Sequence, residues 1–573
     1  MGHAKDTVYG LLSPIDPKDA AVVYAILGIS FHLSIRKVEI DNQFWSLLAI
    51  YTVVWMQLTG AYLGVYHLPV LQAIQMSSLC GCSFMTGLTV SISVYRLFFH
   101  RLRHFPGPWG AKLSRFYNAR LASKSLQYNR ELEKLHEKYG DFVRTGPREI
   151  SIIRPSAIQA FFGFQSECRK STWYSQVTAD QKKTNLATIR DHDYHRLRRK
   201  PWDRAFGPKA LERYDPTIQS RIDLLVEQMR SRQGTPVNIT DWMLFLTYDV
   251  MGKIAFGKSF NQLEDAAEHD AIRTMHGQMR TMAFFSAVPW LLAVIGSLGS
   301  LTGSYGAFIE YCDKMVKETE KIWKSNTTKT PEDVFSYFLK GIEENDPCAP
   351  ATRSALNQDA RLVIVAASDT TGGTLANVMF YLASNQAAYR RLQDELDEAF
   401  PEGDQSFSYN KAKYLPYLDA VITETLRLKP AIPSGQPRVT PPQGVQVDEV
   451  WIPGDTVGII PPWIIQRDER NFVRALEFLP ERWLPGHKEQ LIKDPRAYFP
   501  FQMGPYACVG KNLANQQMKS AVARLALNFD ISLAPGEDGV AFDNGAIDAV
   551  TFQFPPLHVV FKERSKAAAV SVA

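Results

Sequence analysis

Residues 42–95 contain no Asp, Glu, Lys or Arg, and this feature limits the possible folds of the chain more than any other. Two apolar runs, around residues 44–65 and 77–99, occupy or overlap this region. As helices, each can cross a hydrocarbon core of about 30 Å. A shorter run, residues 20–35, predicts either a third span or an interfacial helix. We therefore expect a membrane anchor of two or three transmembrane helices within residues 1–103.

Basic and proline-rich residues follow the last apolar run. Arg96, Arg101 and Arg103 close that run, and the positive-inside rule then places everything after them in the cytosol. A cleavable signal peptide fits poorly, because the apolar region starts late and more apolar segments follow it. Residues 104–110, HFPGPWG, hold two prolines that disfavour helix, so they predict a stiff hinge. Residues 111–573 then predict one large, mainly helical domain with a few short strands.

The bulk composition excludes several classes of protein. A chain of 573 residues that is 45% hydrophobic can bury a large core and is not disordered. The net charge of +5, from 64 basic and 59 acidic residues, gives no case for nucleic-acid binding. Six cysteines without a CxxC pair predict neither a disulfide scaffold nor a zinc site.

One cysteine occupies an unusual position, in FPFQMGPYACVGKNLA at residues 499–514. Cys508 directly precedes a predicted helix, residues 511–528, whose N–H groups and dipole favour a thiolate. Gly504 and Gly510 allow positive φ angles and the close approach of a flat cofactor, while Phe501 can shield the sulfur from water. This pattern predicts an anionic ligand. The alternative is a buried structural cysteine, which is common for a free thiol.

Polar residues interrupt a long apolar helix predicted at residues 360–383. Asp369 and Thr370 lie at its middle and are followed by two glycines. A carboxyl and a hydroxyl there can line a cavity and relay protons. Alternatively, the threonine bonds back to its own helix, which is a frequent arrangement.

Three further stretches are candidates for function. Glu424 and Arg427 share a helical face, and a buried network with Arg482 would fix a loop. Residues 192–206 form a basic helix that predicts a solvated face, an internal anion clamp or a docking surface for an acidic partner. Residues 281–308 lack formal charge; we expect them to dip into the nearby leaflet, with a fourth span as the alternative.

In their order along the chain, these features resemble the haem-thiolate monooxygenases called cytochromes P-450, from about residue 105 to residue 563. The resemblance rests on the anchor, the proline hinge, the basic helix and the Asp369-Thr370 helix. It also rests on Glu424-x-x-Arg427, on FLPERW at residues 478–483, and on Phe501-x-x-Gly504-x-x-x-Cys508-x-Gly510. It implies a fold that is mainly α with small β-sheets. The GPYACVGK loop and the long N-terminal membrane region look most like fungal microsomal members of secondary metabolism.

The resemblance also implies a cofactor and the residues that hold it. Cys508 would be the axial thiolate of haem b, in a loop shaped by Phe501, Gly504 and Gly510. Arg438, in QPRVTP, would bind a haem propionate. Two residues of the basic helix would assist it, Arg198 and Tyr194.

Other roles follow from the same resemblance. Asp369 and Thr370 would deliver protons to bound oxygen, while Glu424, Arg427 and Arg482 would form a structural triad without a chemical role. An outer basic face would receive an acidic reductase that passes electrons from NADPH. That face would include Arg199, Lys200 and Lys511.

Two positions depart from the family pattern. Tyr506 stands where many relatives have an arginine, so one charged propionate contact is lost and the other arginines must compensate. The pair before the acid is Ala366-Ala367, where relatives end in glycine, and the extra methyl can narrow the oxygen groove.

The sequence thus predicts a monooxygenase that uses O₂ and an NADPH-dependent reductase to oxidise an apolar organic substrate. We expect it in the endoplasmic reticulum membrane with its catalytic domain facing the cytosol. Candidate pocket walls are residues 173–188, 284–292, 363–371, 431–435 and 549–553. One alternative is a haem-thiolate isomerase or dehydratase that needs no external electrons, although Asp369-Thr370 argues against it. Another, of a different class, is a polytopic membrane receptor or transporter with a cytosolic ligand-binding domain.

Overall fold

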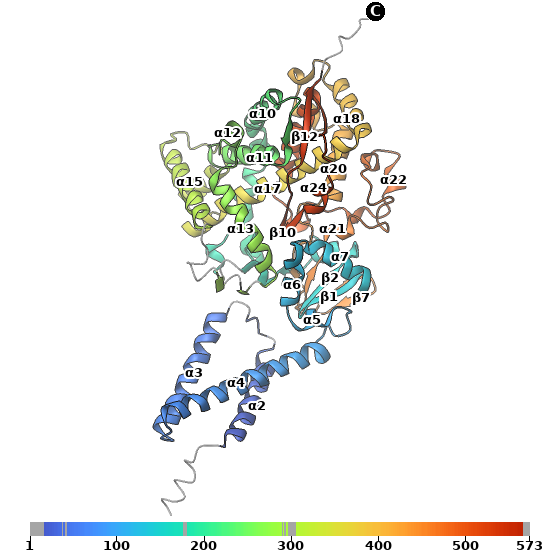
Figure 1. Cartoon of the computed structure of the whole chain (residues 1–573). Helices are drawn as coiled ribbons and strands as arrows, with labels where there is room; N and C mark the ends of the chain where they lie inside the picture. The colour runs from blue at the N-terminus through green and yellow to red at the C-terminus, as the bar shows by residue number, and fades with distance from the viewer. Residues whose placement is uncertain are drawn as a thin grey trace, which may run out of the picture.

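The computed structural model describes residues 16–36, 38–40, 43–175, 180–288, 290–291, 294–295 and 305–564. Three N-terminal helices project from one end of a large helical domain (Figure 1). They are α2 (Pro17–Ile35), α3 (Phe44–Gly64) and α4 (Val70–Val94), and α4 continues as a π-helical turn, Tyr95–Phe99. Each of these three segments is long and apolar enough to cross a membrane. They fit a membrane anchor.

The N-terminal residues of α2 and α4 explain where these two anchor helices begin. The Asp16 side chain accepts a hydrogen bond from the Lys18 N–H at 2.7 Å, and Pro17 occupies the first helical position. The short run at residues 20–35 is therefore part of a helix of 19 residues, Pro17–Ile35. The helix α4 begins earlier than the run 77–99 predicts, because extended Pro69 serves as its N-cap.

Glycines bring α2 and α4 into backbone contact. A Cβ added to Gly28 would stand 2.1 Å from the Phe84 carbonyl oxygen, and one added to Gly87 would stand 2.0 Å from that of Ala25. Small residues allow such close packing where lipid supplies no hydrophobic driving force between helices. A hydrogen bond of 2.8 Å joins His32 Nδ1 to Ser91 Oγ across the same interface. The two helices therefore form one packed unit.

The proline-rich joint at residues 104–110 is docked onto the globular domain. The Pro106 carbonyl accepts a 2.7 Å hydrogen bond from the Arg144 N–H. The buried Arg144 guanidinium donates to the Arg96 carbonyl at 3.0 Å. Arg190 and Glu39 form a second link, an ion pair of 2.8 Å between the domain and the segment before α3. The anchor is thus held by specific contacts as well as by the chain connection.

The globular domain is built mostly from helices. Its N-terminal half contains α5 (Trp109–Leu113), α6 (Phe116–Ser125), α7 (Tyr128–Tyr139), α8 (Ser156–Phe162), α9 (His192–Ala205), α10 (Pro208–Ser231), α11 (Ile239–Phe256), α12 (Gln262–Asp265), α13 (Asp270–Ser286) and α15 (Tyr305–Ser325). The remainder contains α16 (Val334–Glu343), α17 (Arg353–Ser384), α18 (Gln386–Ala399), α19 (Tyr409–Ala412), α20 (Pro416–Leu428), α21 (Pro462–Ile465), α22 (Lys488–Leu491), α23 (Lys511–Asn528) and α24 (Val540–Gly545).

The strands form small sheets. They are β1 (Phe142–Gly146), β2 (Glu149–Ile152), β3 (Arg169–Lys170), β4 (Pro236–Asn238), β5 (Arg438–Val439), β6 (Val445–Val447), β7 (Val450–Ile452), β8 (Val457–Ile459), β9 (Phe529–Leu533), β10 (Ile547–Ala549), β11 (Thr551–Gln553) and β12 (His558–Glu563). The largest sheet has the order β1-β2-β8-β5-β3, and a second has the order β4-β12-β9. In the largest sheet, Lys170 pairs directly with Arg438.

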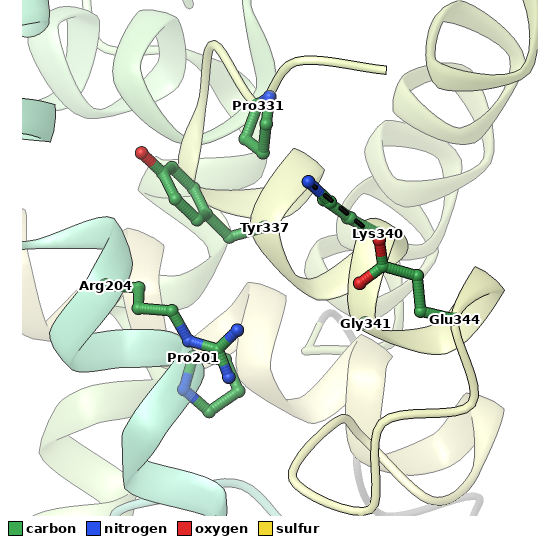
Figure 2. A pocket seen from close by; sticks show the side chains of 7 residues that line it. All are labelled: Pro201, Arg204, Pro331, Tyr337, Lys340, Gly341 and Glu344. Atoms are coloured by element: carbon green, nitrogen blue, oxygen red, sulfur yellow. Dashed lines mark ion pairs between the residues drawn. The ribbon is translucent and has the colours of Figure 1, made fainter.

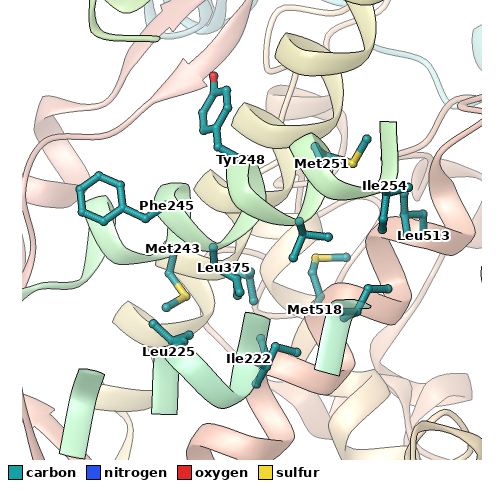
Figure 3. Packing of buried hydrophobic residues seen from close by; sticks show 14 of the residues in the cluster. Ile222, Leu225, Met243, Phe245, Tyr248, Met251, Ile254, Leu375, Leu513 and Met518 are labelled. Atoms are coloured by element: carbon teal, nitrogen blue, oxygen red, sulfur yellow. The ribbon is translucent and has the colours of Figure 1, made fainter. Parts of the chain in front are cut away.

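The long helix α17 runs through the centre of the domain and packs along α11 (Figure 1). Gly372 permits this approach, because a Cβ there would stand 2.8 Å from both Leu244 Cδ2 and Thr247 Oγ1. Figure 3 shows how side chains of α10, α11, α17 and α23 interdigitate, with Met243, Leu375 and Met518 among them. This packing holds α17 against the helix that follows Cys508.

The uncharged segment 281–308 is described only in part. It starts within α13, but residues 289, 292–293 and 296–304 lie outside the described residues. The choice between a fourth span and a dipping segment depends mostly on these residues. Trp290 stacks on Phe44 with ring centroids 5.6 Å apart, so the segment touches the start of α3.

Candidate functional site

The loop that carries Cys508 is fixed by its backbone. A 3₁₀ turn, Gly504–Tyr506, precedes the cysteine, and α23 begins three residues after it. The Cys508 N–H donates to the Phe501 carbonyl at 2.9 Å. Gly504 has φ +67°, and a Cβ there would stand 2.0 Å from the Phe162 carbonyl oxygen. The prediction of positive φ holds for Gly504 but is wrong for Gly510, whose φ is −83°.

The absence of a side chain at Gly510 matters for space. A Cβ there would stand 3.9 Å from the Cys508 sulfur, and no other neighbouring atom lies within 4 Å. Position 510 is therefore open except on the side of the sulfur. A larger side chain at position 510 would occupy space near the sulfur that a flat ligand would need.

Cys508 is an exposed residue, although its thiol lies in a crowded part of the protein. Burial raises the pKa of its thiol. The N–H groups of Gly510 and Lys511 and the charges of Arg199 and Lys511 act in the opposite direction. The favourable groups predicted for the helix start are thus present, but they do not outweigh burial for the free thiol.

Arg199 of α9 supports this loop. Its Nη1 donates to the Ala507 carbonyl at 2.7 Å, and its Nε lies 2.8 Å from Asp203. Its side chain is one-fifth exposed, whereas Lys200 and Lys511 are exposed residues. Of the three basic residues predicted for an outer docking face, Arg199 is therefore largely committed to the cysteine loop.

Two buried cations face the same loop. Lys170 and Arg438 lie opposite each other on β3 and β5, and the Tyr506 ring lies 4.8 Å from Lys170 Nζ and 5.0 Å from Arg438 Cζ. Arg438 Nη1 donates to the Tyr174 hydroxyl at 2.7 Å, and Lys170 Nζ donates to the Leu186 carbonyl at 3.2 Å. Across the described part of the chain, neither cation forms a salt bridge with a carboxylate.

The local electrostatics reflect this uncompensated positive charge. Burial is the largest cause that lowers the pKa of Lys170 well below its usual value, and Arg438 and Arg199 lower it further. Burial, followed by Lys170 and Arg199, also lowers the pKa of His195 to about 2. A buried region that disfavours further positive charge so strongly is suited to bind an anion.

Helix α9 adds more donors beside this region. Tyr194 and Arg198 are four residues apart and therefore lie on one helical face. The Tyr194 hydroxyl, Arg198 Nε and Nη1, and Arg438 Nε are all buried without a hydrogen-bond partner among the described residues. Arg198 Nη2 pairs with Asp359 of α17, so only part of this guanidinium is free to bind another group. Buried donors are rarely left unpaired, so these atoms suit a ligand with acceptor oxygens.

Asp369 and Thr370, at the middle of α17, have different surroundings. Asp369 is buried, and its Oδ1 accepts from the Tyr248 hydroxyl and lies 3.0 Å from His276 Nε2. Its Oδ2 is buried without a partner among the described residues. The Thr370 hydroxyl donates to the Ala366 carbonyl at 2.7 Å, which is the back-bonded alternative, and it remains accessible. Ala366 is exposed although α17 is central, so this stretch of the helix borders open space.

The predicted network around Glu424 is confirmed. Glu424 accepts from Arg427 Nε and Nη2 at 2.8 Å each and from Arg482 Nε at 3.2 Å, and all three residues are fully buried. The Trp483 indole and the Leu479 N–H donate to the same carboxylate. Arg427 and Arg482 bond onward to backbone carbonyls between residues 466 and 491. The triad therefore fastens α20 to the loop that precedes the cysteine.

A surface cavity of about 220 Å³ lies elsewhere, between α9 and α16. Figure 2 shows Arg204 and Pro201 facing Tyr337 and Lys340 across it. None of the predicted site residues lines this cavity, so we do not assign it to the site.

Comparison with known proteins identifies the family. A sequence model described as Cytochrome P450 matches residues 106–561. The chain belongs to the cytochrome P450 family. It is 34% identical over 554 residues to the cytochrome P450 monooxygenase FCK2 of Fusarium pseudograminearum, covering 96% of this chain and 98% of that protein.

Two further relatives belong to the same family. A cytochrome P450 monooxygenase of Eupenicillium brefeldianum is 38% identical over 84% of this chain and 95% of its own length. Tryprostatin B 6-hydroxylase of Aspergillus fumigatus is 34% identical over 85% of each chain. The predicted family, the mainly α fold with small sheets and the monooxygenase class are thereby confirmed. The receptor or transporter alternative is wrong.

Cytochromes P450 carry haem with a thiolate ligand and receive electrons from NADPH through a partner. The site of this chain fits that cofactor. Cys508 would supply the sulfur at the start of a helix, and the buried Lys170 and Arg438 beside the Tyr506 ring would hold the propionates. Among the described residues, no buried carboxylate forms an ion pair with Arg438 or Lys170. None of these carboxylates therefore competes with a propionate for these two side chains.

Sequence reasoning missed four residues of this region. Lys170 follows Arg169 just before a predicted pocket wall, and that basic pair was the available clue. Asp359 is far in sequence from its partner Arg198, and Tyr248 and His276 are far from their partner Asp369, so no spacing rule links them. Only the requirement that a buried carboxyl must find donors indicated that partners of Asp369 exist.

Proposed function

We propose that this cytochrome P450 oxidises an apolar small molecule of secondary metabolism, with Cys508 as the iron ligand. The observation that carries the proposal is the Cys508 loop, in which the cysteine is exposed and the Tyr506 ring lies against the buried Lys170 and Arg438. Haem bound through a thiolate supplies the activation of O₂ and the insertion of one oxygen atom. The protein supplies the ligand, the charge for the propionates, the proton donors and the pocket.

Arg438 and Lys170 are the residues best placed to hold the propionates. Both are buried, and both contact the Tyr506 ring two residues before the cysteine. Lys170 thus places an amine, which a nearby propionate would keep protonated, at the loop where the family's arginine is replaced by Tyr506. Tyr194 and Arg198 would add donors from α9, within the limit that Asp359 places on Arg198.

Asp369 and Thr370 of α17 would have different roles in the chemistry. The accessible Thr370 hydroxyl would orient water or oxygen, because it can donate a hydrogen bond after leaving the Ala366 carbonyl. Asp369 would supply the proton, released on the side where its Oδ2 has no partner among the described residues. Ala366, exposed on the same stretch, supports an apolar wall next to these groups.

The surroundings suggest the location of the enzyme. Arg96, Arg101 and Arg103 follow the last anchor helix, so we propose that the domain faces the cytosol at the endoplasmic reticulum membrane. We propose that the exposed Lys200 and Lys511, on the side of the cysteine loop, receive an acidic reductase. Trp290 stacks on the anchor, which supports a pocket entrance near the lipid surface.

Isotope labelling tests the function while the substrate is still unidentified. Membranes containing the full chain and a reductase are supplied with NADPH, ¹⁸O₂ and a fungal metabolite extract. Products should carry one atom of ¹⁸O and should be absent with Cys508→Ala. Conversion without labelling and without NADPH would overturn the proposal in favour of an isomerase or dehydratase.

A further inference from the structure

Asp369 is the inner end of a chain of three ionisable side chains. His276, on α13, lies 3.0 Å from Asp369 Oδ1 through Nε2 and 2.5 Å from Glu268 Oε1 through Nδ1. The imidazole therefore bridges two carboxylates. A histidine can carry a proton between two such partners because its nitrogens are on opposite sides of the ring.

The three side chains lead from the interior to the surface. The side chain of Asp369 is 3% exposed, that of His276 is 21% exposed and that of Glu268 is 28% exposed. Glu268 precedes α13 and also lies 3.6 Å from Arg273. The outer carboxylate thus meets water, while the inner one has an Oδ2 on the buried side without a partner among the described residues.

The groups around His276 are mostly acidic. Asp369 approaches from α17 and Glu268 from the segment before α13, while Tyr248 of α11 places its hydroxyl 3.3 Å from Nε2. Asp241 of α11 also interacts electrostatically with His276, and Arg273 is the nearby cation through its contact with Glu268. Burial opposes a charge on the ring, but Asp369 and Glu268 prevail and raise the pKa of His276 to about 10. At neutral pH the ring is therefore an imidazolium that holds a proton between the carboxylates.

We propose that Glu268 and His276 form the inlet through which protons from water reach Asp369. The inference rests on the proposed function, because it assigns the supply route for the proton that Asp369 would release. Asp369 and Thr370 are the groups nearest the chemistry, and His276 and Glu268 act through Asp369.

Each proton movement in this inlet balances. His276 gives its Nε2 proton to Asp369 Oδ1, so the imidazolium becomes neutral and the carboxylate becomes a carboxylic acid. Rotation of the carboxyl group presents that proton on the inner side, where it is released. The partly exposed ring then turns and takes a proton from Glu268, which takes one from water. One proton enters for each that leaves, and no electron moves.

The charge state of His276 is tested first, with a measurement that does not depend on oxidation. Hydrogen exchange at C2 of each histidine is followed by mass spectrometry of the intact haem-loaded protein between pH 5 and pH 10. The midpoint for His276 should lie well above that of an ordinary histidine and should fall in Glu268→Gln. A His276 midpoint in wild-type protein at or below the ordinary value would overturn the inlet.

Proton transfer is tested with two variants that differ in charge. His276→Gln removes the charge, whereas His276→Arg keeps a cation between the carboxylates but cannot release a proton at working pH. The readouts are NADPH consumption per haem in vesicles with a reductase, the solvent isotope effect in D₂O, and the pH profile. His558→Gln is the matched control, because His558 lies 3.7 Å from Glu537 at the surface.

The inlet predicts that both His276 variants consume NADPH about tenfold more slowly, at or below the lower end of general acid–base effects. The control should keep the wild-type rate, and all variants should keep the haem spectrum. Wild-type rates and pH profile in His276→Arg would overturn the inlet, because charge alone would then suffice. Failure of the proposed function is distinguishable: haem-loaded wild-type protein would consume no NADPH, while the exchange measurement would still report whether His276 is shared by the two carboxylates.

Discussion

Glu424→Gln is the substitution that tests the buried network most sharply. The carboxylate accepts two hydrogen bonds from Arg427, one from Arg482 and two from the Trp483 indole and the Leu479 N–H. All three charged side chains are fully buried. Glutamine keeps the shape but removes the charge, and it places an NH₂ group among donors.

These contacts determine how much unfolding free energy the substitution removes. Removing one partner of a buried ion pair costs about 3–5 kcal/mol, because the remaining charges lose their compensation. Two half-buried donors, the Trp483 indole and the Leu479 N–H, also lose a good acceptor, at about 0.5–1.5 kcal/mol each. The total is comparable to the whole stability of a domain, about 5–15 kcal/mol. We expect Glu424→Gln to lower the urea midpoint strongly and to reduce haem content, and Glu424→Ala to accumulate without haem.

Pulse proteolysis in urea, on detergent-solubilised protein, measures this change. The matched control is Glu477→Gln, since Glu477 pairs with Arg474 at the same i, i+3 spacing but on the surface. The control should leave the urea midpoint unchanged. If Glu424→Gln and Glu477→Gln gave the same midpoint, the reasoning that this network stabilises the segment before the cysteine loop would be refuted.

Three further predictions follow from contacts described above. Gly504→Ala should lower the haem content of the purified protein, because a non-glycine residue at φ +67° costs roughly 1–3 kcal/mol and the new Cβ meets the Phe162 carbonyl. The control is Gly536→Ala, which has φ +83° but no neighbouring atom within 4 Å, and it should keep full haem. Gly28→Leu should separate α2 from α4 and abolish the disulfide that a His32→Cys, Ser91→Cys pair forms on oxidation, whereas Gly60→Leu, with open space around it, should preserve that disulfide. The raised pKa of His276 should make stability fall as pH rises from about 6.5 to about 10, because the folded state holds a proton that the unfolded state releases. His276→Gln should flatten that dependence, and an unchanged slope in urea midpoints against pH would contradict the assignment.

Patterns with a local cause were predictable from the sequence. The anchor helices follow from apolar runs without charge, and the helix at residues 511–528 follows from its apolar spacing; it is found as α23, Lys511–Asn528. The Glu424 network was predictable because charges flanked by apolar residues and prolines must pair when buried. The start of α4 was missed because Gln72 and Gln75 lower the local hydropathy although the helix already begins at Val70.

Contacts between distant segments were not predictable. Lys170 meets Arg438 only because β3 and β5 are neighbours in a sheet whose strands come from both halves of the chain. His276 reaches Asp369 because the fold brings this part of α13 to the middle of α17, and no residue spacing encodes that proximity. The division of Arg198 between Asp359 and other partners likewise depends on how α9 packs against α17.

The carbon-monoxide difference spectrum of the reduced protein is the most direct test of the central claim, that the Cys508 thiolate binds the haem iron. Membranes that contain the full chain should show a red-shifted Soret band characteristic of a thiolate ligand. Cys508→Ala, produced at the same level, should lack that band, whereas substitution of the buried Cys168 by serine should preserve it. A wild-type band position retained in Cys508→Ala would contradict the account.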